Sequence, residues 1–228
     1  MIEQFLDYTV LNKTLTSKEI KRAVREAIDL KCYGFCTYMG NSYLVEDILK
    51  KNPSEIKKVY VIGFPFGVYE DYEIDQAKTA NGDEYDVVMP MSFFQDDILN
   101  ASETIRKVRE ATKGKTLKLI IETELIKDDE VFSSAITFAK DHEVDFIKTN
   151  TGVYPRRRNL VNDVKFIQGF SSLPIKASGG IKSYLQAKEL LDLGVKRIGT
   201  SNAKAILANE WLSEHLPKTV EQGEINVT

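Results

Sequence analysis

Short apolar runs alternate with longer amphipathic stretches along the whole chain. The runs are rich in Val, Ile, Leu and aromatic residues and are bounded by glycine or polar segments, a pattern typical of buried strands. Their spacing of roughly 20–30 residues leaves room for one helix after each strand. Eight strands are predicted in this way: Phe5–Thr9, Phe35–Tyr38, Val59–Ile62, Tyr85–Val88, Leu117–Ile121, Asp145–Lys148, Ile175–Ala177 and Lys196–Gly199.

The stretches between the runs repeat their apolar residues every three or four positions, as amphipathic helices do. Thr16 followed by Glu19 forms a capping-box signature at the start of the first helix. The predicted helices are Ser17–Leu30, Tyr43–Lys50, Tyr72–Asn81, Asp97–Thr112, Asp128–His142, Leu160–Phe170, Ser183–Leu193 and Ala203–Glu214. Glycines stand where a helix C-cap would use them, at Gly34, Gly82, Gly114 and Gly194.

Eight β–α units in 228 residues most simply form an α/β fold, a single-domain TIM (β/α)8 barrel. An open doubly wound sheet is the alternative, but it usually has fewer strands, and no GxGxxG motif follows the first predicted strand. The chain has no Pro-, Gly- or Ser-rich linker and no shift in composition, so we expect one domain over residues 1–228. The polar segment Pro217–Thr228 is predicted to be a loose C-terminal tail.

The amino-acid composition limits the partners and the kinds of chemistry that the protein can have. Lys and Arg number 31 against 34 Asp and Glu, a net charge of −3, which argues against a nucleic-acid partner. No apolar run reaches 18 residues and the N-terminus does not resemble a signal peptide, so we expect no membrane association. The two cysteines, in CYGFC, are expected to be reduced thiols of a cytoplasmic protein. With only two histidines, polar chemistry falls mainly to Lys, Asp and Glu.

Four charged residues interrupt the apolar strands, where a barrel would usually carry Val, Ile or Leu. They are Lys118 in LKLIIET, Lys148 in DFIKTNTG, Lys176 in PIKASGG and Asp86 in EYDVVM. A purely structural explanation is an inward ion-pair network, or lysines that extend to water at the strand ends. Several charges on neighbouring strands favour a functional explanation, because burying them is costly unless their chemistry is used.

Amine catalysis is the chemistry that these residues suit. A lysine is a nucleophile only when neutral, and burial or a second ammonium nearby disfavours its charged form. Lys148 and Lys176 are 28 residues apart, one β–α unit, and so belong on adjacent strands about 4.8 Å apart. We therefore expect the two charges to disfavour each other and to make a Schiff-base nucleophile. Asp86 is a candidate for carrying protons to and from the resulting enamine.

Three small loops follow the late strands: Thr149–Gly152 (TNTG), Ser178–Gly180 (SGG) and Gly199–Asn202 (GTSN). Glycine lets backbone N–H groups approach phosphate oxygens, and barrels often bind phosphate with their last βα loops. Each loop alone is equally compatible with ordinary helix capping. Together they predict a phosphate site.

The segments LDYTVL, VIGFPFG, NGDEYDVVMP, LKLIIET, DFIKTNTG, IKASGGI and KRIGTSN resemble, in order and spacing, those of the 2-deoxyribose-5-phosphate aldolases. The resemblance covers some nine-tenths of the chain. It implies a class I aldolase on a TIM barrel that uses no metal or organic cofactor. Such an enzyme cleaves 2-deoxy-D-ribose 5-phosphate reversibly into D-glyceraldehyde 3-phosphate and acetaldehyde. Family members are usually homo-oligomers, so a dimer or tetramer is expected.

The resemblance also assigns roles. Lys148 matches the lysine that forms the imine, Lys176 the lysine that perturbs it, and Asp86 the acid that relays protons. The positions expected to contact the substrate or its phosphate are Asp7, Lys118, Thr149, Gly152, Gly179, Gly180, Gly199 and Ser201.

Some residues depart from the family or remain open. Asn150 stands where Ser is common, and Val153 where Phe or Lys is frequent. The run Arg156–Arg158 has no family counterpart and is either a solvated loop or an added grip on phosphate. Glu122 is either a second acid or a group that orients Lys118. Two other functions compete: an aldolase for another phosphorylated sugar or keto acid, and an inactive barrel that senses a sugar phosphate.

Overall fold

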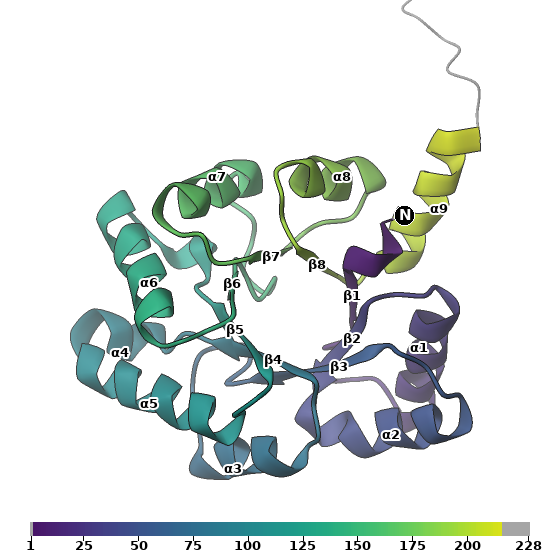
Figure 1. The fold of residues 1–228 in the computed structure, drawn as a ribbon, viewed down its shortest axis with the longest axis horizontal. Helices are drawn as coiled ribbons and strands as arrows, with labels where there is room; N and C mark the ends of the chain where they lie inside the picture. The colour runs from purple at the N-terminus through teal and green to yellow at the C-terminus, as the bar shows by residue number, and fades with distance from the viewer. Residues whose placement is uncertain (1, 216–228) are drawn as a thin grey trace, which may run out of the picture.

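The computed structural model describes residues 2–215 and closes eight parallel strands into one barrel. Each strand pairs with its neighbours in chain order, and β8 pairs with β1 through Asp7 opposite Gly199, so the sheet has no free edge. Figure 1 shows the ring of strands at the centre with the helices around it. The predicted single-domain (β/α)8 barrel is confirmed. The strands are β1 (Leu6–Thr9), β2 (Gly34–Tyr38), β3 (Lys57–Ile62), β4 (Glu84–Val88), β5 (Thr116–Ile120), β6 (Phe146–Lys148), β7 (Ile175–Ser178) and β8 (Arg197–Thr200).

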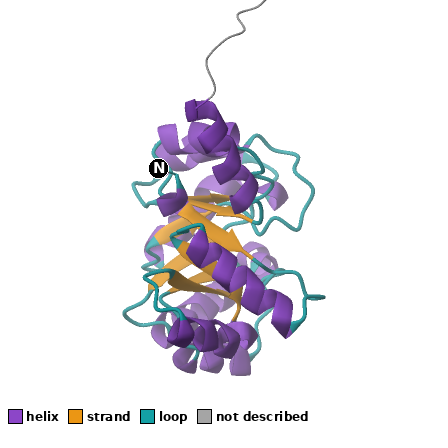
Figure 2. Cartoon of the chain, turned by 90° about the vertical axis from the view of Figure 1, so that its right-hand side faces the viewer, coloured by secondary structure: helices purple, strands orange, loops and turns teal. Residues whose placement is uncertain are grey.

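The helices form an outer layer around the strands (Figure 2). They are α1 (Ser17–Asp29), α2 (Ser42–Lys51), α3 (Asp71–Thr79), α4 (Met91–Asp96), α5 (Ile98–Ala111), α6 (Asp129–Asp141), α7 (Leu160–Phe170), α8 (Tyr184–Asp192) and α9 (Ala203–His215). Three short 3-10 turns add to these, at Glu3–Phe5, Met39–Asn41 and Thr123–Leu125. The sequence analysis missed α4, because six residues are too few to display a helical period.

Two of the four predicted glycine caps are wrong. Lys31 and Asn81 take the left-handed backbone conformation after α1 and α3, with φ of 54° and 50°. Gly34 instead opens β2, at a point where a Cβ would lie 2.5 Å from Asp7 Oδ1. The close approach of β1, and not the end of a helix, requires the glycine. The predicted capping box of Thr16 and Glu19 at the start of α1 is confirmed.

The main hydrophobic core lies between the strands and the helices. Side chains alternate along each strand, so residues such as Tyr85, Leu117 and Ile147 pack outward into this core. Their neighbours on the same strands point into the barrel. There, a small apolar cluster of Cys36, Val59 and Val61 sits beside charged residues. Buried charged residues therefore lie inside the barrel.

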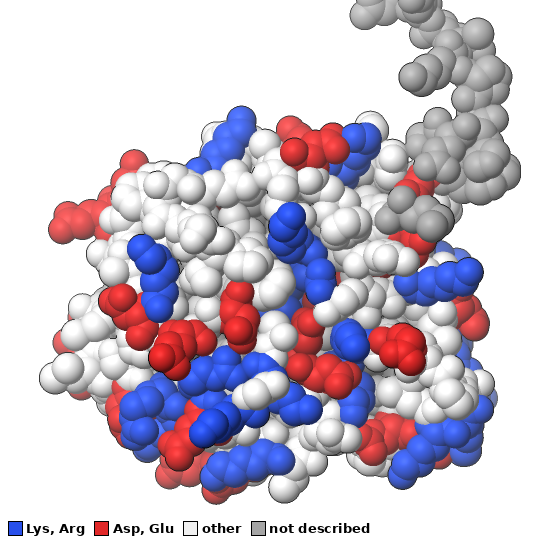
Figure 3. All heavy atoms as spheres, in the orientation of Figure 1, with Lys and Arg blue, Asp and Glu red and all other residues white. Residues whose placement is uncertain are grey.

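Both cysteines are buried and unpaired. Acidic and basic side chains are interspersed over the face seen in Figure 3, as the small net charge leads one to expect. Within residues 2–215, no helix combines the length and the apolar character needed to cross a membrane. The predicted loose tail, Pro217–Thr228, lies outside the described residues.

Candidate active site

Three lysines converge on one aspartate inside the barrel. Strand register places Asp86 opposite Lys118 across β4 and β5, and Lys148 opposite Lys176 across β6 and β7. Asp86 Oδ1 accepts a hydrogen bond from Lys118 Nζ at 3.0 Å. Asp86 Oδ2 accepts from Lys148 Nζ at 2.9 Å and from Lys176 Nζ at 2.7 Å. The four charged strand residues singled out in the sequence thus form one cluster.

Two further carboxylates complete the cluster. Lys176 Nζ also donates to Asp7 Oδ2, and Lys118 Nζ lies 2.5 Å from Glu84 Oε2. Three carboxylates therefore face three lysine side chains. All are almost fully buried, the most exposed being Glu84 at 4%. Balanced pairing of this kind is what allows charges to remain inside a protein.

The cluster sets the protonation of its members. Burial alone would raise the pKa of Asp86, but Lys118, Lys148 and Lys176 together hold it well below its usual range. Burial would lower the pKa of Lys176, yet the Asp7 and Asp86 carboxylates raise it above its ordinary value. The pKa of Lys118 is raised in the same way, chiefly by Asp86 against the effect of burial. These three groups therefore stay ionised at neutral pH.

This result corrects one expectation. Their spacing along the chain predicts that Lys148 and Lys176 disfavour each other's charge, whereas Lys176 keeps its proton firmly. The reason is that Asp7 and Asp86 both contact Lys176, and pairing across distant strands cannot be read from spacing along the chain. A permanently charged Lys176 still stands beside Lys148 as a fixed cation.

A cavity of about 380 Å³ opens above the cluster, at the C-terminal ends of the strands. Of the three clustered lysines, Lys148 is the one that lines it. Most of its wall comes from the loops after β6, β7 and β8, which Figure 1 shows as neighbours in the ring. The predicted substrate-contacting residues in this wall are Gly152, Gly179, Gly180, Gly199 and Ser201.

The other predicted site residues lie beneath or behind the wall. Asp7 and Lys118 are fully buried in the charged cluster, where they contact Lys176 and Asp86 respectively. Thr149 is fully buried as well, and its hydroxyl donates to Ser178 O and accepts from Ser178 N, both at 3.0 Å. These positions support the cavity from below rather than facing it.

Side-chain bonds hold the first two loops together. Ser178 Oγ donates to Asn150 O at 2.6 Å, and Asn150 Nδ2 donates to Ser178 O at 3.3 Å. Asn150 Oδ1 also accepts from Glu124 N at 3.3 Å. Gly179, with φ of 97°, approaches so closely that a Cβ would lie 3.0 Å from Asn150 Cβ. Asn150, the departure from the family pattern, therefore serves as a brace between loops.

The cavity wall is suited to an anion. The SGG loop leads into α8, whose N-cap Ser183 forms a capping box with Gln186, and the GTSN loop leads into α9. Helix N-termini carry partial positive charge and free N–H groups that favour phosphate. Arg156 and Lys182 also line the cavity and add two cations.

Glu122 is considered from sequence as a second acid or as a group that orients Lys118. Lys118 pairs with Glu84 and Asp86. Glu122 instead bonds to Thr151, and a role as an acid stays a prediction. Glu122 Oε2 accepts hydrogen bonds from Thr151 N at 3.1 Å and Thr151 Oγ1 at 2.5 Å. Its Oε1 is buried and has no hydrogen-bond partner among the described residues. Burial raises the pKa of this carboxyl, although the bonds from Thr151 oppose the change. Its backbone is left-handed, with φ of 51°, two residues after the end of β5.

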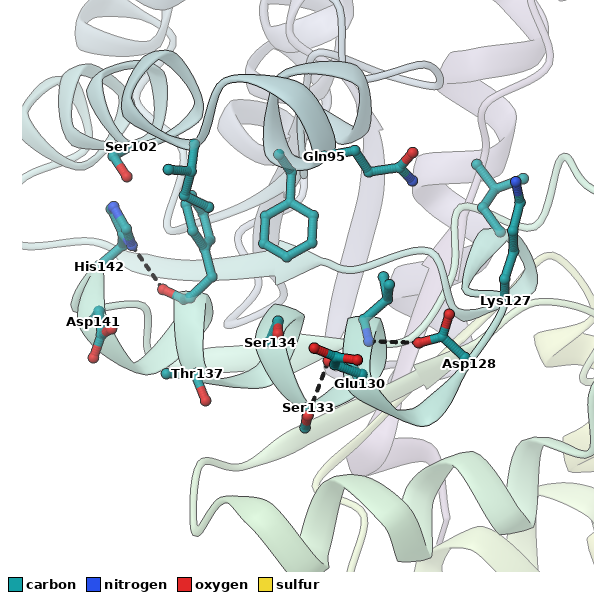
Figure 4. A pocket seen from close by; sticks show the side chains of 15 residues that line it. Gln95, Ser102, Lys127, Asp128, Glu130, Ser133, Ser134, Thr137, Asp141 and His142 are labelled. Carbon is teal, nitrogen blue, oxygen red and sulfur yellow. Dashed lines mark hydrogen bonds between the residues drawn. The ribbon is translucent and has the colours of Figure 1, made fainter.

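A larger cavity of about 750 Å³ lies elsewhere, among helices α4, α5 and α6 (Figure 4). Its polar side chains include Gln95, Ser102 and Asp141, which come from the outer helices and not from strand ends. His142 Nδ1 is already hydrogen-bonded to Phe138 O at 2.7 Å. The buried charges lie under the smaller cavity, so we take that one as the candidate active site.

Within residues 2–215, no group of three or more His, Cys, Asp or Glu side chains is arranged to hold a metal ion.

Sequence reasoning missed several residues of the site. Glu84 stands two residues before Asp86 on β4, and Thr9 stands two residues after Asp7 on β1. Because side chains alternate along a strand, this spacing predicts that both point inward, and Thr9 lines the cavity. Glu124 and Lys182 also line the cavity, and only the folded loops bring them there.

The comparisons with known proteins agree with this architecture. A family model described as the DeoC/LacD family aldolase matches residues 1–203, so the chain belongs to that family. The deoxyribose-phosphate aldolase of Mycoplasmoides pirum is 32% identical over 210 residues, which are 88% of this chain and 94% of the relative. The deoxyribose-phosphate aldolase of Methanocella arvoryzae is 33% identical over 212 residues, 90% of this chain and 94% of the relative.

Solved structures show the same barrel. QR15, an aldolase, superposes with a TM-score of 0.85 at 28% identity, over 94% of this chain and 97% of its own. A deoxyribose phosphate aldolase from Aeropyrum pernix, described as a unique tetrameric structure, gives a TM-score of 0.80 at 26% identity. That match covers 92% of this chain and 91% of the other.

Proposed function

We propose that the chain is a class I aldolase that cleaves 2-deoxy-D-ribose 5-phosphate reversibly into D-glyceraldehyde 3-phosphate and acetaldehyde, through a Schiff base on Lys148. The observation that carries the proposal is the position of this lysine. Its amine shares one oxygen of Asp86 with Lys176, and it is the clustered lysine that lines the cavity. The names of the relatives at 32–33% identity support the substrate.

The cluster surrounds the reacting amine with fixed charges. Lys176 keeps its charge because two carboxylates hold it. Lys148 Nζ lies beside this fixed cation and shares Asp86 Oδ2 with it, and a lysine reacts as a nucleophile in its neutral form. Asp86 stays a carboxylate, so it can accept a proton from a lysine and return it through water.

The proposed reaction proceeds as follows. Lys148 Nζ adds to the C1 aldehyde carbon, and loss of water gives an iminium. As the C3 hydroxyl loses its proton, the C2–C3 bond breaks, and the electron pair of that bond moves toward the iminium. D-glyceraldehyde 3-phosphate leaves, and an enamine remains on Lys148. Protonation at the terminal carbon restores the iminium, which water hydrolyses to acetaldehyde and free amine.

The remaining predicted residues have roles in the same proposal. The amides of Gly152, Gly179, Gly180 and Gly199, with the hydroxyl of Ser201, bind the phosphate in the loops that line the cavity. Asp7 and Lys118 position Lys176 and Asp86 from beneath, and Thr149 fixes the loops. No metal or organic cofactor is assigned to these steps.

We extend the proposal to the setting of the enzyme. It acts as one domain in the cytoplasm, as a dimer or tetramer, without a nucleic-acid or membrane partner. The tetrameric Aeropyrum pernix structure supports assembly. Light scattering during size-exclusion chromatography measures the number of subunits, and a monomer at micromolar concentration would contradict this part.

Borohydride trapping tests the central claim. The protein is incubated with acetaldehyde and reduced, and peptide mass spectrometry locates the resulting N-ethyl group. We expect it on Lys148, and we expect its loss in Lys148→Met. Lys165→Met, which removes an exposed lysine from α7, is the control and should label as the wild type does.

A coupled assay completes the test. Alcohol dehydrogenase consumes acetaldehyde as it is released, so NADH loss reports cleavage of 2-deoxyribose 5-phosphate. An unmodified Lys148 in an active enzyme would refute the Schiff-base assignment. Cleavage of a different phosphorylated sugar or a keto acid, and not of this one, would refute the substrate.

A further inference from the structure

We propose that Arg156 is a specificity-determining residue that reserves the site for phosphorylated substrates, an inference that rests on the proposed function. The guanidinium lies at the cavity mouth against the SGG loop. There it supplies a full positive charge that the backbone amides of the loops cannot provide.

The position of Arg156 is the first observation. Its Cδ and one of its terminal nitrogens lie 3.5 and 3.6 Å from the place that a Cβ on Gly180 would occupy. Gly180 and Arg156 both line the cavity that Lys148 opens into. The guanidinium of Arg156 thus covers the backbone of the loop that precedes α8.

The lack of an internal partner is the second observation. Within residues 2–215, no carboxylate forms an ion pair with Arg156, and its side chain makes no hydrogen bond to another protein group. The next but one arginine differs, because Arg158 Nε donates to Asp163 Oδ1 at 2.8 Å and its guanidinium stacks over Phe132. Of the three arginines in the run, Arg156 is the one that lines the cavity.

Hydrogen bonds hold the segment that follows Arg156 in place. Glu124 Oε2 accepts hydrogen bonds from the backbone of Arg157 at 2.7 Å and of Arg158 at 3.1 Å. Arg158 anchors the same segment to α7 through Asp163, which also accepts from Thr123 Oγ1 at 2.8 Å. A loop fixed immediately after Arg156 limits where its side chain can go. The cost of ordering the guanidinium on binding is therefore reduced.

The chemistry of the guanidinium points to phosphate. Its planar fork donates two parallel hydrogen bonds to phosphate or carboxylate oxygens, and its charge does not titrate at neutral pH. A phosphate monoester carries close to two negative charges there, which neutral amides alone leave uncompensated. An unphosphorylated sugar offers nothing for this group to bind. Arg156 should therefore act on selectivity between the two.

The test compares Arg156→Ala with Arg157→Ala. The second variant removes the same charge one residue away, from a side chain outside the cavity wall. Steady-state kcat and KM are measured for 2-deoxyribose 5-phosphate and for 2-deoxyribose. We expect Arg156→Ala to raise KM for the phosphorylated sugar about 10- to 100-fold, the size of a charge-assisted contact. The preference for the phosphorylated over the unphosphorylated sugar, as a ratio of kcat/KM, should fall by the same factor.

Two outcomes would overturn the inference. One is equal KM values for Arg156→Ala and Arg157→Ala. The other is an equal loss of kcat/KM for both sugars in Arg156→Ala, which would indicate a purely structural role. Arg156→Lys keeps the charge but loses the planar fork of the guanidinium. Its KM for the phosphorylated sugar should lie between those of the wild type and the alanine variant.

A binding measurement separates this inference from the proposed function. Calorimetric titration with inorganic phosphate needs no turnover. If wild-type protein binds phosphate at least tenfold more tightly than Arg156→Ala, the inference stands even where deoxyribose phosphate is not cleaved. Equal phosphate affinity in an active aldolase would refute the inference and leave the proposed function intact.

Discussion

The side chain of Lys118 is fully buried beneath the cavity and holds two carboxylates, Glu84 and Asp86. Its importance at the scale of single residues is electrostatic. Without it, only two lysines of the cluster, Lys148 and Lys176, would remain beside three buried acids. Removing one partner from a buried ion pair is far more costly than the pair is worth, because it leaves an uncompensated charge in a medium of low polarity.

Lys118→Met is therefore expected to lower the free energy of unfolding by about 3–5 kcal/mol. Urea denaturation monitored by circular dichroism measures the change. Lys188→Met is the matched control, since Lys188 pairs with Asp192 on the surface of α8 and should contribute little. Comparable losses in the two variants would contradict the balance of charges described for the cluster.

The buried carboxyl of Glu122 predicts a pH effect. Its pKa is raised above the unfolded value of about 4.3 by burial, against the opposing bonds from Thr151. The folded state thus binds the proton more tightly, so this contribution to stability is present at low pH and is lost as pH rises through the folded pKa. Glu122→Gln keeps the shape without the charge. Relative to wild type, its stability should improve as pH rises.

Urea denaturation of wild type and Glu122→Gln at pH 4.5 and pH 7.5 measures this difference. Glu110→Gln, at an exposed site on α5, provides the baseline and should show no such trend. If the stability of Glu122→Gln relative to wild type decreased from pH 4.5 to pH 7.5, the pH effect would have the opposite sign and the prediction would be refuted.

Residues of the site differed in how well the sequence revealed them. Lys148, Lys176 and Asp86 were found because a charge inside an apolar strand is conspicuous. Their partners Asp7 and Glu84 sit at strand starts, where charges are ordinary, and their pairing depends on register across the barrel. The protonation of Lys176 could not be predicted without those partners.

At the scale of elements, the period of the apolar pattern was sufficient for most of the fold. Each predicted strand and each predicted helix ends within two residues of its observed bounds. The failures have local causes. The helix α4 is too short for a period, and α1 and α3 end in left-handed Lys31 and Asn81 although a glycine stands nearby.

The capping box of α8 yields a prediction at this scale. Ser183 Oγ accepts from Gln186 N at 3.3 Å, and Thr16 makes the equivalent bond with Glu19 N at 3.4 Å in α1. Losing either cap should cost about 1 kcal/mol of stability. Only α8 follows the SGG loop of the cavity, so Ser183→Ala should also raise KM for the sugar phosphate.

Thermal or urea unfolding and steady-state kinetics on Ser183→Ala and Thr16→Ala provide both readings. Thr16→Ala serves as the control for a lost cap, because neither Thr16 nor α1 lines the cavity. Identical KM values in the two variants would mean that the start of α8 has no part in binding phosphate.

At the scale of the whole molecule, a closed barrel has no edge strand that can move aside. Gly34 is a tight point in its wall, where an added Cβ would lie 2.5 Å from Asp7 Oδ1 and 3.0 Å from Val59 Cγ2. Gly34→Ala should cost about 1–3 kcal/mol through overpacking. It should also lower kcat, because Asp7 holds Lys176.

Gly169→Ala is the matched control for this substitution. Gly169 lies in α7, and a Cβ there would meet nothing within 4 Å. Since alanine favours helices over glycine by up to about 1 kcal/mol, the variant should be slightly stabilised. Chemical denaturation and kcat are measured for both variants. A Gly34→Ala enzyme as stable and as active as wild type would show that the barrel wall can shift to accommodate the added methyl group.

The equal numbers of acids and lysines beneath the cavity have a consequence for the course of the reaction. A protonated imine on Lys148 carries one positive charge, so the three acids and three lysines of the cluster are in electrical balance when it has formed. When the enamine forms, that charge disappears from the nitrogen, and the proton taken from the substrate hydroxyl keeps the net charge of the site unchanged for as long as it stays within the site. The surrounding dipoles then have little to rearrange at any stage, which is the condition under which a preorganised interior lowers a barrier most.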